Sequence, residues 1–136
     1  MITAELEFVH KDPRRRIREA SSDEGGFSVQ WFDEVEVQSG PLGKHAHGEK
    51  EETFVILRGG GYLLHALLDK KGNVVGEATR TPLHAGIVIH LKPNEGHTFY
   101  LDPEAEMICF SNKPFDKDDV IHNDNLAVEN FPGLAT

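Results

Sequence analysis

The sequence of 136 residues carries a formal charge of −9, and 38% of its residues are hydrophobic while 27% are charged. This length and composition fit one compact soluble domain and exclude a disordered chain. The longest apolar run falls well short of the roughly 20 residues that a membrane-spanning helix needs. The acidic balance argues against a broad surface for nucleic acid or anionic membrane, because phosphate groups require clustered Lys and Arg.

The cellular environment is indicated by the N-terminal segment and by the cysteine content. The segment lacks the apolar core of a secretory signal, and Cys109 is the one cysteine, so no intramolecular disulfide can form. Both features lead us to expect a reducing, cytoplasmic environment. Cys109 lies within the apolar run 107–110, where we expect a small buried hydrophobe rather than a working thiol.

A basic run near the start of the chain is the local exception to the acidic balance. It consists of Arg14, Arg15, Arg16 and Arg18. Alternation along a β-strand would divide these residues between two faces, so a solvated strand edge is the favoured interpretation. The alternative is contact with an anionic ligand or with another subunit.

Short strands separated by turns follow from residue 27 onward. Phe27, Val29 and Trp31 alternate with polar residues, which is the period of a strand with one buried face. The segment Asp69–Asn73 has the composition of a hairpin tip. Many short strands of this kind indicate a β-sandwich or barrel, so we predict an all-β fold. Further apolar runs span residues 53–57, 62–68, 86–91, 97–101 and 107–110.

The last part of the chain differs in character. After residue 114 it is polar, acidic and only weakly periodic. A short helix capped by Asp116 and an extended tail packed on a neighbour are both compatible with this composition. We expect a single domain over residues 1–136, with a barrel core at about 25–112 and a polar tail at 113–136.

A group of histidines and glutamates has the spacing of a metal site. His45 and His47 are one residue apart, so on a strand both imidazoles project from one face and can bind one ion. Glu51 and Glu52 begin the next expected strand and offer a carboxylate, while His97 follows the turn at 93–96. Such donors suit Zn²⁺, Fe²⁺, Mn²⁺, Ni²⁺ or Cu²⁺ and leave coordination positions open for a ligand.

At these residues the sequence resembles the cupin superfamily, whose first motif runs Gly, His-x-His, Glu and Gly. Gly40 precedes His45 by four intervening residues, four more separate His47 from Glu52, and six separate Glu52 from Gly59. The first gap is one residue shorter than the usual pattern. The second motif resembles residues 86–97, although its turn glycine is displaced and position 92 is lysine where proline is common.

The resemblance covers about residues 25–112 and implies a double-stranded β-helix, or jelly-roll, barrel. It implies His45, His47, Glu52 and His97 as ligands of a divalent transition metal. Both faces of the strand after position 51 are apolar, so alternation does not decide whether Glu51 or Glu52 is the metal ligand. The spacing of the family motif favours Glu52. The family also implies a homodimer. A cupin that has lost its metal, or that uses these side chains for acid–base work, is the alternative.

Other histidines carry weaker expectations. His84 and His90 flank the second motif, where they could support the ligands or contact a substrate, but a structural role is also open. His10 and His122 are expected at the surface.

Three functions follow. The first is a metalloenzyme of the oxygenase or isomerase type acting on a small polar metabolite, with His90, Tyr100 or Glu51 handling protons.

The second is a metal-independent sugar-nucleotide keto-isomerase or epimerase, because Gly40–His47 and the polar tail are similar to the cupin 3,4-ketoisomerases. In that case the paired histidines act as acid and base, and the basic run meets a nucleotide diphosphate. The third is a cupin that binds a small molecule without catalysis.

Overall fold

The computed structural model describes residues 1–134, whose regular structure is almost entirely β-strand, so the all-β prediction is confirmed. None of the helices within this range is long and apolar enough to span a membrane. Three short 3₁₀ helices, all after residue 116, are η1 (Lys117–Asp119), η2 (Val128–Asn130) and η3 (Pro132–Leu134). The strands are β1 (Glu7–Asp12), β2 (Arg15–Ser22), β3 (Phe27–Asp33), β4 (Ser39–His47), β5 (Glu52–Arg58), β6 (Gly60–Leu68), β7 (Val74–His84), β8 (Val88–Leu91), β9 (Glu95–Leu101), β10 (Glu106–Ser111) and β11 (Val120–His122).

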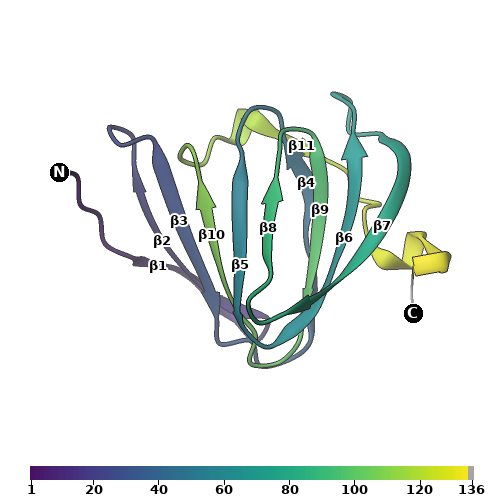
Figure 1. The fold of residues 1–136 in the computed structure, drawn as a ribbon, viewed down its shortest axis with the longest axis horizontal. Helices are drawn as coiled ribbons and strands as arrows, with labels where there is room; N and C mark the ends of the chain where they lie inside the picture. Colours follow the sequence, from purple (N-terminus) through teal and green to yellow (C-terminus); the bar gives the residue numbers. More distant parts are fainter. Residues whose placement is uncertain (135–136) are drawn as a thin grey trace.

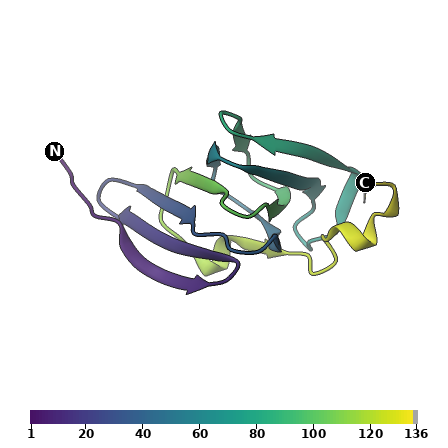
Figure 2. The same ribbon diagram turned by 90° about the horizontal axis from the view of Figure 1, so that it is seen from below.

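The strands form two antiparallel sheets that face each other (Figures 1 and 2). One sheet has the order β1-β2-β3-β10-β5-β8, and the other has the order β11-β4-β9-β6-β7. From β4 to β10 the chain passes repeatedly between the sheets, as in a jelly roll. This exchange places β4 and β9 of one sheet opposite β5 of the other.

Alternate residues of the facing strands build a hydrophobic core between the sheets. Phe54 and Ile56 on β5 point toward Phe99 and Leu101 on β9, and none of the four is more than 4% exposed. The ring centroids of Phe54 and Phe99 are 4.6 Å apart. Burial of a side chain of this size contributes roughly 1.5–3 kcal/mol. At one end of this core, the inward-facing positions of the strands are occupied by polar side chains.

The sheets extend beyond the range of 25–112 that was expected for the barrel core. β1 and β2 form an antiparallel ribbon, and β2 pairs with β3, so residues 7–22 enlarge the first sheet. At the other end of the chain, β11 pairs with β4. The hairpin expected at Asp69–Asn73 is confirmed, since it joins the paired strands β6 and β7.

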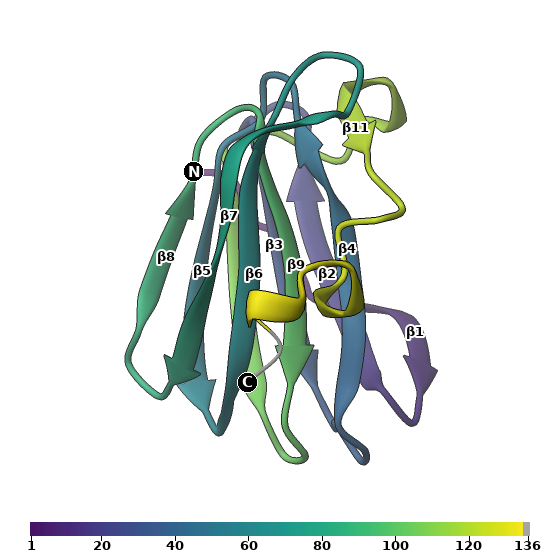
Figure 3. The same cartoon turned by 90° about the vertical axis from the view of Figure 1, so that its right-hand side faces the viewer.

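The C-terminal segment crosses the outer face of the second sheet (Figure 3). Asp116 caps η1 through its side chain, as one of the two sequence interpretations expected, although the helix is a single turn. Beyond β11, Leu126 is fully buried against Leu64 of β6, and the Thr98 hydroxyl donates a hydrogen bond of 2.6 Å to the Leu126 carbonyl. The segment therefore packs against its own barrel.

Candidate metal centre

Four side chains meet at one end of the space between the sheets. His45 and His47 come from β4, Glu52 from β5 and His97 from β9, and one potential ligand atom of each lies within 4.8 Å of the others. His47, Glu52 and His97 are between 3% and 6% exposed, and His45 is partly exposed. The fold thus brings together the four residues that the spacing pointed to.

A β-bulge in β4 sets the position of His45. The register between β4 and β9 shifts between Gly43 and His45, after which His45 pairs with His97. Gly43 has a φ of +119°, and a Cβ there would lie 2.7 Å from the His97 carbonyl oxygen, so glycine permits this close approach. The ring centroid of His45 then lies 5.0 Å from that of His47 and 4.7 Å from that of His97.

Strand alternation separates the two adjacent glutamates. Glu52 begins β5 and shares its inward face with Phe54 and Ile56, and all three are buried. Glu51 precedes the strand, and its side chain is 43% exposed. The structure therefore places Glu52 at the cluster and Glu51 outside it, in agreement with the motif spacing.

The two carboxylate oxygens of Glu52 have different neighbours. Oε2 accepts a hydrogen bond from the Cys109 thiol at 3.4 Å and lies 3.8 Å from Lys50 Nζ. Oε1 lies 3.0 Å from His47 Nε2 and 3.5 Å from His97 Nε2. The buried thiol and ammonium thus hold one oxygen, and the other oxygen faces the imidazoles.

A backbone contact orients the ring of His97. Its Nδ1 lies 3.1 Å from the carbonyl oxygen of Glu95 and can only donate a proton there. This hydrogen bond fixes the tautomer and leaves Nε2, which faces Glu52, with a free lone pair. Metal-binding histidines commonly have such a second contact.

Burial and mutual repulsion set the charges of the cluster. Burial, followed by the nearby His97 and His47, lowers the pKa of His45 to about 3, and burial also lowers the pKa of His97. Burial would by itself raise the pKa of Glu52, but His47, His97 and Lys50 lower it to about 2. At neutral pH the site therefore presents neutral imidazoles at positions 45 and 97 and a charged carboxylate, which are the protonation states that bind a metal.

The residues present fit a divalent transition metal. Among residues 1–134, the buried Nδ1 of His47 has no hydrogen-bond partner, and Oε1 of Glu52, although 3.0 Å from His47 Nε2, accepts no hydrogen bond of good geometry. An unpaired buried polar atom costs roughly 1–3 kcal/mol, and coordination would compensate the carboxylate oxygen. Three imidazoles and one carboxylate suit Zn²⁺, Fe²⁺, Mn²⁺, Ni²⁺ or Cu²⁺ and leave room for an outside ligand.

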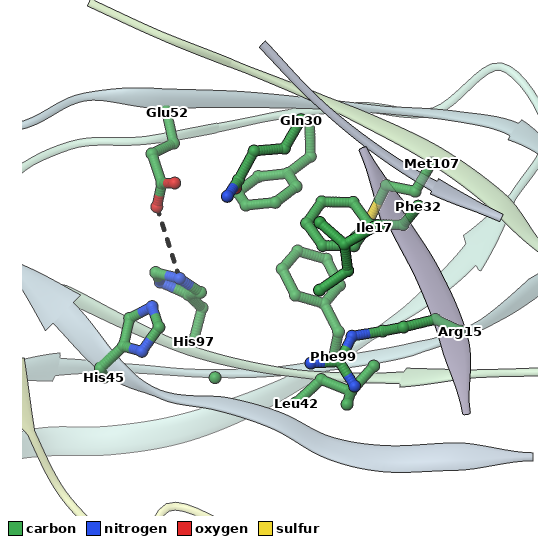
Figure 4. Close-up of a pocket in the computed structure, with 12 residues that line it drawn as sticks. Arg15, Ile17, Gln30, Phe32, Leu42, His45, Glu52, His97, Phe99 and Met107 are labelled. Carbon is green, nitrogen blue, oxygen red and sulfur yellow. Dashed lines mark ion pairs between the residues drawn. The ribbon is translucent and has the colours of Figure 1, made fainter. Parts of the chain in front are cut away.

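A pocket of about 220 Å³ opens beside the cluster. Figure 4 shows His45, Glu52 and His97 on one side of it and Arg15 extending from the opposite side. Gln30 adds an amide to the lining. The apolar walls between the two polar ends come from Ile17, Phe32, Leu42, Phe54, Phe99 and Met107.

His90 and Glu51, which the sequence suggested for proton handling, are placed outside the pocket. The Nε2 atom of His90 lies 3.0 Å from a carboxylate oxygen of Glu51, and its Nδ1 lies 2.9 Å from the Thr53 hydroxyl. The side chains of His90 and Glu51 are 46% and 43% exposed. Because Glu52 points inward, this neighbouring group occupies the outer face of the first sheet, and its position does not support the expected role.

Tyr100 also lies away from the cluster. It follows Phe99 on β9 and therefore projects from the opposite face of the strand. Its ring stacks on Tyr62 with centroids 4.5 Å apart, and its hydroxyl accepts a hydrogen bond from the Val128 backbone N–H at 2.9 Å. Tyr100 thus anchors the C-terminal segment rather than facing the pocket.

The pocket includes one residue whose part in it the favoured sequence interpretation missed. The run of arginines was expected to be a solvated strand edge, but Arg15 lines the pocket from β2. His65 pairs with His97 across β6 and β9 but does not line the pocket. Alternation places Arg15 on the same face of β2 as Ile17, but that this face points inward follows only from the pairing of β2 with β3.

Comparisons with known proteins bear on the fold. The sequence matches no protein-family model and no curated protein. Its structure is similar to the capsular polysaccharide assembling protein CapF from Staphylococcus aureus, with a TM-score of 0.65, 20% identity and 87% of this chain covered. The chain spans only 31% of CapF.

Two sugar-nucleotide isomerases also have similar structures. The QdtA 3,4-ketoisomerase from Thermoanaerobacterium thermosaccharolyticum, solved with TDP, gives a TM-score of 0.59 at 17% identity, covering 79% of this chain and 75% of that one. WlaRA from Campylobacter jejuni, a TDP-fucose-3,4-ketoisomerase, gives 0.57 at 15% identity, covering 70% and 66%. These neighbours share the RmlC-like architecture of two facing antiparallel sheets. The chain has the jelly-roll fold of the cupins.

Proposed function

We propose that this protein is a metal-binding cupin that acts on a small polar metabolite held in the pocket beside His45, His47, Glu52 and His97. The observation that carries the proposal is the convergence of four ligand-type atoms within 4.8 Å, at the buried end of an open pocket. A divalent ion bound there would supply a Lewis-acid or redox centre. We class the activity as that of an oxygenase or an isomerase.

The chain's own residues prepare this site in three ways. Burial keeps the imidazoles of His45 and His97 neutral, so their lone pairs remain available at neutral pH. The Cys109 thiol and the Lys50 ammonium hold one oxygen of Glu52 and direct the other toward the imidazoles. The apolar walls exclude bulk water, which strengthens the electrostatic interactions with a bound molecule.

Elemental analysis of protein purified without a histidine tag tests the proposal. We expect close to one equivalent of a transition metal per chain. We also expect His47→Ala to lose at least about 90% of it, because even contacts that only support a ligand change metal affinity 10- to 100-fold. His84→Ala, which changes an exposed histidine on the opposite side of β7 from the core, is the matched control and should keep its metal. A metal-free wild-type protein, or equal loss in both variants, would contradict the proposal.

A second candidate function is a metal-independent sugar-nucleotide keto-isomerase that uses His45 and His47 as acid and base. The structural similarity to QdtA and WlaRA favours it. TDP should then raise the melting temperature of metal-free protein, and a TDP-linked 4-keto sugar should be isomerised in the presence of EDTA. Loss of turnover on addition of EDTA would reject this second candidate.

A further inference from the structure

Arg15 is set apart from its neighbours by strand alternation. Arg15 and Ile17 face the pocket, whereas Arg16 and Arg18 lie on the other face of β2 and bind Asp33 at 2.6 Å and 3.0 Å. The arginines of this basic run therefore have two different roles. The outer arginines join β2 to β3, and the inner one contributes a cation to the pocket.

The guanidinium of Arg15 has no anionic partner of its own. Its Nη1 is buried without a hydrogen-bond partner, and the group forms no ion pair within residues 1–134. The adjacent Arg14, by contrast, binds Asp12 at 2.8 Å. The chain has 23 acidic residues, so the missing partner is not explained by a shortage of carboxylates.

A partly buried cation without a partner destabilises the folded chain. Burial, and then repulsion from Arg14, lowers the pKa of Arg15, although an arginine stays charged at neutral pH. The pocket therefore keeps an unsatisfied positive charge that a bound anion would neutralise. The fork of parallel N–H groups matches a carboxylate, which can accept two hydrogen bonds from it.

The lining of the pocket defines the rest of the ligand. Phe99 and Leu42 belong to the apolar wall that lies between Arg15 and the metal-ligand cluster, as Figure 4 shows. A pocket of about 220 Å³ holds a small metabolite, whereas a sugar nucleotide would have to extend out of it into solvent. A fitting molecule has an anionic head, a short apolar body and an oxygen donor at its far end.

We propose that Arg15 is the anion-binding residue of this pocket and that the protein takes small carboxylic acids, with the carboxylate on Arg15 and the opposite end toward the metal-ligand cluster. The inference rests on the proposed function only for what binds the other end of the ligand, the end that points toward the metal-ligand cluster. The carboxylate subsite itself depends only on Arg15 and on the apolar walls.

Calorimetric titration with matched acids and amides tests the assignment. The probes are butanoate, hexanoate and benzoate, each compared with its primary amide, which has nearly the same shape but no charge. Protein is titrated as purified and after removal of metal with EDTA. We expect at least one acid to bind about tenfold or more tightly than its amide in both forms, since a hydrogen-bonded charge is worth that much in affinity.

Substitutions within the arginine run test whether Arg15 causes the preference for acids over amides. Arg15→Gln should abolish the preference for the acid while leaving amide binding and metal content unchanged. Arg14→Gln, which removes an exposed charge from the same run, should keep the preference. If circular dichroism shows that Arg15→Gln does not fold, Arg15→Lys takes its place and should weaken acid binding, because a lysine has no fork of donors.

Three results would overturn the assignment. The first is an acid preference that survives in the Arg15 variant, and the second is the absence of any acid preference in the wild type. The third is TDP binding that requires Arg15 while none of the three acids is preferred, which would assign the charge to a diphosphate. If the protein as purified, before any EDTA treatment, contains no metal and still prefers acids through Arg15, the proposed metal chemistry is contradicted but the carboxylate subsite remains in place.

Discussion

Glu51 and Glu52 are neighbours in the chain but have different surroundings. The Glu52 carboxylate lies between Cys109 and the imidazoles, whereas Glu51 lies outside the pocket beside His90. Chemically identical side chains thus receive different environments from a one-residue step at the start of β5, because successive residues of an extended chain face opposite sides. The pair offers an internal control for the metal site.

Conversion of each glutamate to glutamine tests the role of Glu52. Glu52→Gln replaces an anionic donor by a neutral amide and should lower metal affinity at least about tenfold, by the magnitude typical of changes near a metal. Glu51→Gln alters only an exposed contact and should leave the affinity within about a factor of two. Competition with a chelator of known affinity measures both. Equal effects of the two substitutions would remove Glu52 from the ligand set.

At the level of whole elements, the C-terminal segment makes a separable contribution to stability. Leu126 is fully buried against β6, and its carbonyl accepts the hydrogen bond of Thr98 on β9. Leu126→Ala should therefore cost roughly 2–5 kcal/mol in the free energy of unfolding, as buried leucines do.

Urea denaturation checks this value against a matched leucine. Leu67 belongs to β6, the strand on which Leu126 packs, but is 45% exposed, so Leu67→Ala should change the free energy of unfolding by no more than about 0.5 kcal/mol. A loss in Leu126→Ala no greater than in Leu67→Ala would show that the segment does not stabilise the barrel.

The strands differ in how well the sequence predicted which of their side chains belong to the site. On β4, strand geometry alone predicts that His45 and His47 share a face, whereas on β5 only the spacing of the cupin motif favoured Glu52 over Glu51. On β9, alternation from His97 places Phe99 inward and Tyr100 outward, so a stricter use of the same rule would have excluded Tyr100 from the pocket.

The N-terminal ribbon was not predictable in the same way. β2 has Ile17 as a lone bulky apolar residue among charged neighbours, so its hydrophobic pattern does not mark an inward face. Which face points inward is decided by its pairing with β3, where Ile17 lies opposite Phe32. That pairing joins residues separated by a turn, and only the folded sheet shows that it carries Arg15 into the pocket.

At the scale of the whole molecule, the outer face of the first sheet carries exposed apolar side chains. Leu57, Val88 and Phe110 lie on β5, β8 and β10 and are 42%, 60% and 47% exposed. An exposed apolar face of this kind is typical of a protein–protein contact. We expect a second copy of the chain to cover it, which is the homodimer implied by the resemblance to cupins.

Light scattering at micromolar concentration tests the homodimer. The wild type should have twice the mass of one chain, and Phe110→Glu, which places a charge in the apolar face, should shift the mass toward that of a single chain. Lys70→Glu changes an exposed residue of the β6–β7 hairpin and serves as the control. A wild-type mass equal to one chain would contradict the expectation.

In the proposed metal centre, three strands from two facing sheets supply the ligands of one ion. Anomalous diffraction from crystals of the metal-supplemented protein would locate that ion. We expect a single peak at the metal's absorption edge, at about 2.0–2.2 Å from one atom of each of His45, His47, Glu52 and His97. A metal peak elsewhere in the molecule, or no peak at these residues despite supplementation, would contradict it.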